Sequence, residues 1–360
     1  MGARWINPPI FRNEKENFNL KAMLPQPIRD LLRAGTVIPA HPLALKASLR
    51  LDEDRQRRLS RYYIDAGAGG VAVGVHTTQF EIRQPGIDLY EPVLRLASEE
   101  IHSADLQRPF IQVAGICGPT DQACLEAELG VKYGYHLGLL SMGGLQHLSE
   151  DDLLERTRAV AAIIPVFGFY LQPAVGGRIL SYDFWREFAE IPNVEAIKVA
   201  AFNRYQTLDV VRAVCNSSRR DDISLYTGND DNIVADLLTP YRFEVNGLSV
   251  TKYFVGGLLG HWAVWTESAV ELLRRIKHCM AADYKGAADL LEIGGKVTDM
   301  NAALFDAKHQ FKGSIAGIHE VLRRAGLLEG VWCLSPKEKL SDGQLAEIDR
   351  VMQAYPELIR

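Results

Sequence analysis

Asn193-Val-Glu-Ala-Ile-Lys-Val-Ala200 is the stretch from which the fold and the chemistry of this chain can be inferred. Its apolar residues form a run that is too short for a helix and rich in β-branched side chains, which is typical of a buried parallel strand. Lys198 lies inside this run, close to the end at which the chain leaves the strand. A lysine in such a place is paired with a carboxylate, extends its amine to water, or is held neutral as a nucleophile. Both a structural ion pair and a catalytic amine fit the stretch, so the rest of the chain has to decide.

The composition fits one α/β barrel with an appendage. The chain has 360 residues, of which 47% are hydrophobic, and its net charge of -5 shows no basic surplus of the kind that nucleic-acid-binding proteins carry. No apolar run reaches the roughly 18 residues that cross a bilayer, and the N-terminus lacks the apolar core of a signal peptide. The five cysteines include no C-x-x-C pair, which favours a reducing compartment over a disulfide framework or a zinc site. We therefore expect a cytoplasmic protein that binds neither nucleic acid nor membrane.

Short apolar runs alternate with longer amphipathic runs from Val37 onwards. Eight strands, each followed by a helix, predict a closed (β/α)8 TIM barrel, an α/β fold, because a doubly wound sheet usually stops nearer about six strands. The expected strands are Val37–His41, Gly70–Val75, Phe110–Ile116, Tyr135–Ser141, Val166–Leu171, Val194–Val199, Ile223–Thr227 and Gly247–Val250. The expected helices between and after them are Asp52–Asp65, Pro92–Leu106, Thr120–Tyr133, Glu150–Ile164, Tyr182–Glu190, Tyr205–Asn216, Asn229–Leu238 and Val255–His278.

The two ends of the chain depart from this alternation. Residues 1–36 are polar and irregular, with a short helical segment near Pro27–Ala34, and are expected to form an N-terminal extension. Residues 37–278 are assigned to the barrel. Residues 279–360 contain only helical patterns and are expected to form a C-terminal helical appendage with segments at Ala281–Ala303, Ser314–Ala325 and Ser341–Tyr355.

Gly67-Ala-Gly69-Gly-Val-Ala72 satisfies the pattern G-x-G-x-x-G/A of dinucleotide-binding proteins. In those proteins the motif follows a strand and opens a helix, so that the phosphate meets the helix N-terminus. Here the expected helix comes before the glycines and the expected strand comes after them. We therefore expect these glycines to end a helix and turn into a strand, and not to bind a nucleotide.

Catalytic residues of a barrel gather where the strands end and the following loops begin. The expected strand ends place His41, His76-Thr77-Thr78, Tyr170 and Lys198 on one rim, together with Gly228-Asn-Asp230-Asp231. Tyr170 and Lys198 lie on consecutive strands, about 5 Å apart if they are paired in register.

These residue types suit one chemistry. A tyrosine beside a nucleophilic amine can shuttle protons while a carbinolamine forms and dehydrates. Two hydroxyls with backbone amides, as at Thr77 and Thr78, suit a carboxylate. Together they indicate Schiff-base chemistry on a 2-oxo acid.

The chain resembles the dihydrodipicolinate synthase and N-acetylneuraminate lyase superfamily of class I aldolases. The resemblance runs from about Val37 to the C-terminal helices. It rests on motifs that are similar to the family's tyrosine motif, its "PNI-x-GIK" lysine strand, its G-T-T-G-E loop, its glycine and acidic pair after strand seven, and the T-P of its opening strand. In this sequence these are Tyr170-x-x-Pro173, Ile191-Pro-Asn-Val-Glu-Ala-Ile-Lys198, Thr77-Thr78, Gly228-Asn-Asp230-Asp231 and Pro39-Ala-His41-Pro42.

The resemblance implies a barrel with a helical C-terminal domain, often assembled as a homo-oligomer, and a reaction without a cofactor. It implies that Lys198 forms an imine with pyruvate or a related 2-oxo acid and that Tyr170 relays protons. By the same resemblance Thr77 and Thr78 hold the carboxylate. Gly228, Asp230 and Asp231 would then face the part of the substrate beyond the 2-oxo acid, such as an aldehyde partner.

The sequence also departs from the family pattern. His76 replaces the glycine before Thr-Thr, and Gln79-Phe80 replaces the Gly-Glu after it. Val175 stands where the synthase has an arginine for a second carboxylate, and Arg178 lies three positions further on. Ser141-Met142-Gly143-Gly144 follows the fourth strand in place of a tyrosine pair. The lysine chemistry is therefore predicted, and a role in lysine biosynthesis is not.

Three other functions use the same residues. One is dehydration or decarboxylation of a sugar-derived 2-oxo acid through the same imine, and another is a barrel that binds a 2-oxo acid without turnover. The third is a metal-dependent hydrolase that uses His41, His76 and Asp230. His41 and His76 are included in the predicted site as groups for proton transfer or metal binding, but a metal site needs three or four convergent ligands and none is predicted here.

Overall fold

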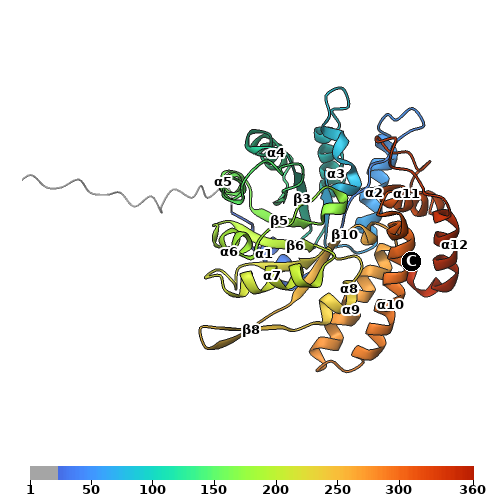
Figure 1. Cartoon of the computed structure of the whole chain (residues 1–360). Coiled ribbons are helices and arrows are strands. Elements are labelled where there is room, and N and C mark those ends of the chain that lie inside the picture. Colours follow the sequence, from blue (N-terminus) through green and yellow to red (C-terminus); the bar gives the residue numbers. More distant parts are fainter. Residues whose placement is uncertain (1–22) are drawn as a thin grey trace, which may run out of the picture.

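The computed structural model describes residues 23–360 and has at its centre a closed barrel of parallel strands (Figure 1). In chain order the barrel strands are β1 (Val37–Pro39), β2 (Gly70–Val73), β3 (Ile111–Ile116), β4 (Leu137–Ser141), β5 (Val166–Leu171), β6 (Val194–Ala200), β7 (Ser224–Thr227) and β10 (Phe254–Leu259). Their order in the eight-stranded sheet is β1-β10-β7-β6-β5-β4-β3-β2. A parallel bridge between Ala40 and Ala72 joins the two ends of the sheet. The predicted α/β TIM barrel is confirmed.

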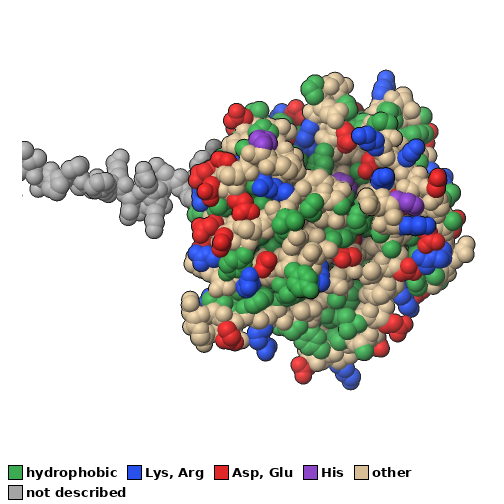
Figure 2. Space-filling view, viewed as in Figure 1, with side chains coloured by type: hydrophobic (Ala, Val, Ile, Leu, Met, Phe, Trp, Pro, Cys, Tyr) green, Lys and Arg blue, Asp and Glu red, His purple; other side chains and the backbone are tan. Residues whose placement is uncertain are grey.

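Helices surround the barrel, and more helices follow it. They are α1 (Gln26–Ala34), α2 (Glu53–Asp65), α3 (Tyr90–Ser103), α4 (Thr120–Lys132), α5 (Glu150–Ala161), α6 (Tyr182–Glu190), α7 (Arg204–Cys215), α8 (Ile233–Leu238), α9 (Thr266–Ala281), α10 (Ala287–Leu304), α11 (Ser314–Arg324) and α12 (Gln344–Ala354). Helices α10 to α12 are the three expected C-terminal segments and lie together on one side of the barrel (Figure 1). No helix within residues 23–360 is long and apolar enough to cross a membrane. Acidic and basic side chains are interspersed over the face seen in Figure 2.

The prediction for the eighth strand is wrong. Gly247–Val250 belongs mostly to β9 (Leu248–Lys252), which pairs antiparallel with β8 (Tyr241–Val245) in a hairpin that stands off the barrel (Figure 1). The turn residues Asn246 and Gly247 both have positive φ, and Asn-Gly is a strong hairpin signal that the strand prediction overlooked.

The barrel strand is instead β10, which was assigned to the start of the helix Val255–His278. Its two glycines, Gly256 and Gly257, are not typical strand residues, so the sequence pattern did not indicate a strand there. Both are needed for close packing. A Cβ at Gly256 would lie 2.4 Å from the carbonyl oxygen of Thr36, and one at Gly257 would lie 2.6 Å from the Trp262 ring. The helix that follows begins only at Thr266.

The glycines of the dinucleotide-like motif lie where the order of elements predicted. Gly67 follows α2 in the left-handed region, with φ +84°, and the chain then enters β2 at Gly70. The motif therefore follows a helix and leads into a strand, which is the reverse of the order in dinucleotide-binding proteins.

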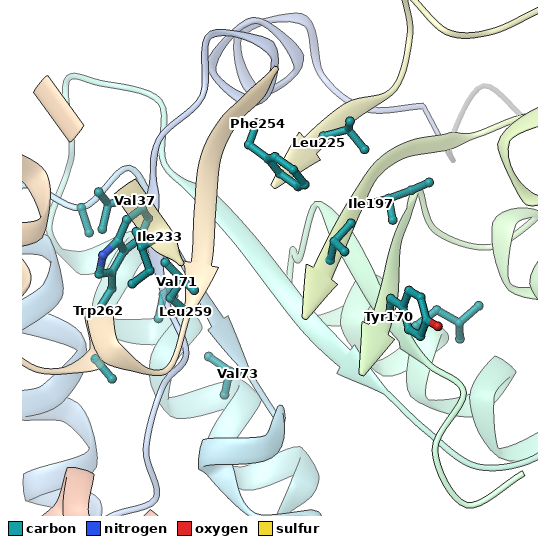
Figure 3. Close-up of a cluster of buried hydrophobic side chains, with 14 of the residues drawn as sticks. Val37, Val71, Val73, Tyr170, Ile197, Leu225, Ile233, Phe254, Leu259 and Trp262 are labelled. Atoms are coloured by element: carbon teal, nitrogen blue, oxygen red, sulfur yellow. The ribbon is translucent and has the colours of Figure 1, made fainter. Parts of the chain in front are cut away.

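Alternation along the strands divides the core into two layers. One layer fills the barrel and includes Phe167, Phe169 and Leu171 of β5; Leu32 of α1 joins it and closes the end opposite the strand tips. The other layer packs between the strands and the helices and includes Ile197 of β6 and Tyr170 of β5 (Figure 3). This division decides which side chains can reach a site inside the barrel.

A buried ion pair joins the tips of β2 and β3 to the outer helices. The guanidinium of Arg83 donates to Glu126 at 2.8 and 3.0 Å and to the carbonyl oxygens of Gly74 and Gly115 at 3.0 and 2.9 Å. Arg83 also lies over the ring of Tyr90, with its Cζ 4.3 Å from the ring centroid. Both charged side chains are less than 10% exposed, so neither charge can be left alone at low cost.

We expect the variant Arg83→Met to lower the free energy of unfolding by about 3–5 kcal/mol, because it leaves the Glu126 carboxylate buried without its partner. The double variant Arg83→Met/Glu126→Leu should regain part of this loss. Urea unfolding followed by circular dichroism measures both. Arg158→Met, which removes the exposed pair with Glu155, is the control and should cost less than about 1 kcal/mol. Additive losses in the double variant would contradict the role of the ion pair.

Candidate active site

A cavity opens at the carboxyl ends of the barrel strands, where barrel enzymes hold their substrates. Its space is about 550 Å³ when the mouth, which is open to solvent, is included. The lining residues are Ala40, Val75, His76, Thr77, Phe169, Leu171, Gln172, Val175, Lys198, Ala200, Phe202, Gly228, Asp230, Gly260, Phe305, Phe311 and Ser314.

Lys198 enters the cavity from β6. It alternates with Ala196 and Ala200, which belong to the interior layer, and is only 8% exposed. Its Nζ lies 4.3 Å from the centroid of the Phe169 ring, the residue opposite it on β5. Burial lowers the pKa of Lys198 below its ordinary 10.5, and the nearby carboxylate of Asp230 opposes part of this shift.

Gly228 leaves room for the lysine side chain. It follows β7, and its amide donates to the carbonyl oxygen of Val199 at 2.7 Å. A Cβ built at Gly228 would lie 2.5 Å from Cε of Lys198 and 2.9 Å from Cβ of Ala200. No other residue type fits there without displacing the lysine side chain.

Asp230 lies in the same cavity, and its neighbour Asp231 does not. The Oδ1 atom of Asp230 accepts a hydrogen bond from the amide of His261 at 3.1 Å, and its carbonyl oxygen accepts one from Nδ2 of Asn301 at 2.6 Å. Burial raises the pKa of Asp230 above its ordinary value, while its hydrogen bond from His261 and the charge of Lys198 act in the opposite direction. Asp231 is exposed, and its carbonyl oxygen accepts from Thr298 of α10.

Tyr170 is not opposite Lys198, so the expected register is wrong by one residue. The sheet pairs Phe169 with Lys198 and Tyr170 with Val199. Because side chains alternate, Tyr170 points out of the barrel, where its ring lies 5.3 Å from Trp185 and its hydroxyl accepts from the amide of Leu180 at 3.4 Å. Figure 3 shows its ring within the cluster of buried hydrophobic side chains that also contains Ile197. Phe169, which the sequence argument did not select, is the aromatic residue at the amine.

The loop after β2 presents two of its predicted residues to the cavity. His76 and Thr77 line it, and the Oγ1 of Thr77 donates to the carbonyl oxygen of Ala40 at 2.8 Å. Burial lowers the pKa of His76, and the positive charge of Lys198 lowers it further, so the imidazole is neutral near pH 7.

Thr78 and His41 support this loop from behind. The Oγ1 of Thr78 donates to the carbonyl oxygen of His41 at 2.6 Å and accepts from the amides of Gly74 and Val75. The ring of His41 contacts the carbonyl oxygen of Pro42 at 2.8 Å and Oγ of Ser60 at 3.0 Å. Neither side chain lines the cavity. The two hydroxyls were expected to act together, but they lie on successive residues of a short 3-10 helix, His76–Thr78, so Thr77 lines the cavity and Thr78 hydrogen-bonds within the loop.

A polar network behind the tips of β6 and β7 fixes the position of Phe202. Oδ1 of Asn229 accepts the amide of Phe202 at 2.9 Å, and its Nδ2 donates to Asp236 at 2.9 Å. The buried carboxylate of Asp236 also accepts from Thr227 at 2.7 Å and Tyr241 at 3.0 Å and is paired with the Arg204 guanidinium. The Asn229 position was within the recognised motif, but its supporting role was not predicted.

The C-terminal region contributes residues that no motif indicated. Phe305 follows α10, Phe311 precedes α11 and Ser314 begins α11, and all three line the cavity. The ring centroids of Phe202 and Phe311 are 5.7 Å apart in an edge-to-face arrangement. Only the packing of the C-terminal helices over the barrel rim brings these residues to Lys198.

Val175 lines the cavity, and Arg178 is engaged elsewhere. The guanidinium of Arg178 donates to the carbonyl oxygens of Leu145 and Leu148 at 2.9 and 3.0 Å, in the loop after β4. The cavity wall therefore has an apolar side chain where the synthase pattern has an arginine. Lys198 is the one lysine or arginine among the residues that line the cavity.

The residues considered for a metal site are divided between two places. His76 and Asp230 line the cavity, whereas His41 lies behind the loop. Across residues 23–360, no three His, Cys, Asp or Glu side chains are grouped so that they could hold a metal ion.

Comparisons with known proteins match the chain through its fold. No protein-family model and no curated protein matches its sequence. The dihydrodipicolinate synthase of Oceanobacillus iheyensis is 17% identical with a TM-score of 0.71, and the match covers 92% of this chain and 99% of that chain. The synthase DapA-2 of Bacillus anthracis is 18% identical with a TM-score of 0.70, over 90% and 99% of the two chains. The protein CdNal of Clostridium difficile, solved in complex with mannosamine, is 14% identical with a TM-score of 0.70, over 89% and 99%. The chain therefore has, over nearly its full length, the barrel fold with C-terminal helices that these enzymes share.

Proposed function

We propose that the protein is a class I aldolase, a carbon–carbon lyase that forms a Schiff base between Lys198 and pyruvate or a related 2-oxo acid. The observation that carries the proposal is the Lys198 amine, which lies in a cavity at the strand tips, 8% exposed and without a carboxylate within 4 Å among residues 23–360. Burial lowers the pKa of such an amine, so a larger fraction of it is neutral near pH 7. The neutral amine is the form that attacks a carbonyl carbon. The fold shared with dihydrodipicolinate synthases supports the same chemistry.

In the proposed reaction, the amine attacks C2 of the 2-oxo acid, and the carbonyl oxygen leaves as water with the two amine hydrogens. Protonation of the imine nitrogen and loss of a proton from C3 give an enamine, and C3 then forms a bond to an aldehyde carbon, whose oxygen takes up a proton. Water hydrolyses the imine and restores the amine. The reverse sequence cleaves the carbon–carbon bond.

We assign the proton transfers to His76 and Asp230, because both line the cavity and Tyr170 faces away from it. A neutral imidazole accepts protons, and a carboxyl with a raised pKa can supply them. Thr77, which lines the cavity, would receive the carboxylate of the 2-oxo acid. Thr78 would serve by holding their loop in place.

A binding protein without turnover is the second candidate. The observation in its favour is that Phe169, which has no proton to transfer, stands beside the amine. Calorimetry with pyruvate should detect binding for both candidates, but the second candidate predicts no product at high enzyme concentration.

Dehydration or decarboxylation of a 2-oxo acid uses the same imine, and product analysis distinguishes these reactions from aldol cleavage. The expected homo-oligomer and cytoplasmic location also stay predictions, and sedimentation tests the first of them.

Incubation with pyruvate and borohydride should leave a reduced adduct on Lys198, located by peptide mass spectrometry. Lys198→Arg should abolish it, since a guanidinium is not a nucleophile at neutral pH. Lys252→Arg is the matched control: burial also lowers the pKa of Lys252, but its Nζ donates to the carbonyl oxygens of Arg220 and Ile223, away from the cavity. The proposal is wrong if no 2-oxo acid gives an adduct that depends on Lys198.

The rate of adduct formation should rise with pH and reach half its maximum below pH 10.5, because burial lowers the pKa of the amine and the neutral form reacts. Asp230→Asn should move this midpoint to lower pH, because the carboxylate that stabilises the ammonium form is removed while an oxygen remains for the His261 amide. Asp231→Asn, at an exposed position, should move it less. A midpoint that rises in Asp230→Asn would contradict the assigned electrostatics.

Gly228→Ala should slow adduct formation by about 100-fold, since displacement of a reacting group by about 1 Å has an effect of that size. The added methyl would occupy the path of the Lys198 side chain. Gly295→Ala on α10 is the control, because a Cβ at Gly295 meets no atom within 4 Å. Rapid-quench trapping with pyruvate gives both rates, and an unchanged rate in Gly228→Ala would show that the amine does not need this space.

A further inference from the structure

The part of the cavity beyond Lys198 has an apolar roof. Phe202 comes from the loop after β6, Val175 from the loop after β5, and Phe305 and Phe311 from the C-terminal helical region. Resting on the function proposed above, we infer that the aldehyde partner of the 2-oxo acid has an apolar body, aromatic or branched aliphatic, with one neutral oxygen that bonds to Ser314.

Both phenylalanines that meet at the roof have an unusual backbone conformation. Phe202 has φ +50° and Phe311 has φ +65°, in the left-handed region that large side chains rarely adopt. The amide of Phe202 is fixed by Asn229 at 2.9 Å, and that of Phe311 donates to the carbonyl oxygen of Asp306 at 3.1 Å. Strained residues of this kind persist where the surroundings hold them, and they are concentrated at ligand sites. The fold thus holds two rings over the amine at a cost in backbone energy.

Ser314 supplies a polar group on this roof. It is 3% exposed, and its Oγ has no hydrogen-bond partner among the described residues. A buried hydroxyl normally has a partner, so an unpartnered one that lines a cavity indicates a ligand oxygen. Its place at the first residue of the eleven-residue helix α11 favours an oxygen that accepts.

The charges of the cavity exclude the other classes of acceptor. No arginine lines it, because Arg178 is bound to the loop after β4, so a second carboxylate or a phosphate would meet no cation apart from Lys198. Asp230 is the one carboxylate that lines it. A polyhydroxylated sugar needs several polar partners, but apart from His76, Thr77, Lys198 and Asp230, which the proposed imine chemistry uses, only Gln172 and Ser314 are polar among the lining residues. An apolar aldehyde matches this lining.

The bond-forming step is the one already described. The enamine C3 attacks the carbonyl carbon of the aldehyde, the carbonyl oxygen takes up a proton, and hydrolysis of the imine releases a 4-hydroxy-2-oxo acid. The aldehyde's apolar body would then lie against the rings of Phe202 and Phe311, which line the cavity together.

The experiment measures kcat/KM for pyruvate condensation with benzaldehyde, 2-hydroxybenzaldehyde, glyceraldehyde and N-acetylmannosamine, using the full chain. We expect the two aromatic aldehydes to exceed the two polyols by at least about 100-fold. Borohydride trapping of the pyruvate adduct on Lys198 is measured with the same protein preparation. No adduct at all overturns the proposed function, whereas an adduct with equal or better use of the polyols overturns only the present inference.

Variants test the roof directly. Phe311→Asn keeps a residue that tolerates the left-handed region but removes the ring, and it should raise the KM for benzaldehyde at least about tenfold. Phe243→Asn, on the hairpin strand β8 away from the cavity, is the matched control and should not change this KM. Ser314→Ala should reduce the preference for 2-hydroxybenzaldehyde over benzaldehyde. An unchanged KM in folded Phe311→Asn, judged by circular dichroism, would show that the ring only seals the barrel.

Discussion

The burial of one amine is the constraint on which the rest of this structure depends. An ammonium ion inside a barrel loses its hydration, and no carboxylate among the described residues lies within ion-pair distance to compensate. Three groups lie in the same cavity as the amine. They are the ring of Phe169, whose centroid is 4.3 Å from the amine nitrogen, the carboxylate of Asp230, whose pKa is raised, and the neutral imidazole of His76. Burial is the larger effect and lowers the pKa of the amine, and the Asp230 carboxylate offsets only part of this shift.

The pleat of β5 and β6 then decides which neighbours the amine has. Strands expose alternate residues to opposite sides, so a shift of one residue exchanges the interior set for the exterior set. Phe169 faces Lys198, and Tyr170 belongs to the layer between the strands and the helices. Under the proposed function, proton transfer is therefore assigned to groups from the other strand tips. Asp230 follows β7, which neighbours the lysine strand β6, and His76 follows β2, which lies across the closed sheet from it.

The C-terminal helices complete the cavity that the barrel only begins. The roof residues Phe305, Phe311 and Ser314 lie more than a hundred positions after Lys198 in the chain and reach it because α10 and α11 pack against the rim. On the barrel side, Asp236 and Asn229 hold Phe202 in a left-handed conformation that faces this roof. Buried hydrogen bonds of this kind rigidify the walls, and a rigid wall of phenylalanines selects substrates by shape and polarity.

The sequence by itself determined the barrel, because the alternation of short β-branched runs with amphipathic runs is a local property of the chain. It also determined the candidate nucleophile, because a lysine inside an apolar strand is unusual wherever the strand lies. It placed His76, Thr77, Gly228 and Asp230 at strand ends, and these do line one cavity with Lys198. It could not assign the eighth strand correctly, since the glycines of β10 make contacts that only the folded structure reveals.

Tertiary structure alone decided the register and the roof. The partner of Lys198 on the neighbouring strand depends on the relative shift of two strands, and the shift depends on contacts around the whole closed sheet. Backbone geometry at single residues decides which side chains face the cavity. Thr77 faces it, whereas the side chains of Thr78, His41 and Tyr170 do not. The approach of Phe311 and Ser314 follows from helix packing across the rim. These are relations between segments distant in sequence, and no local pattern of residue types encodes them.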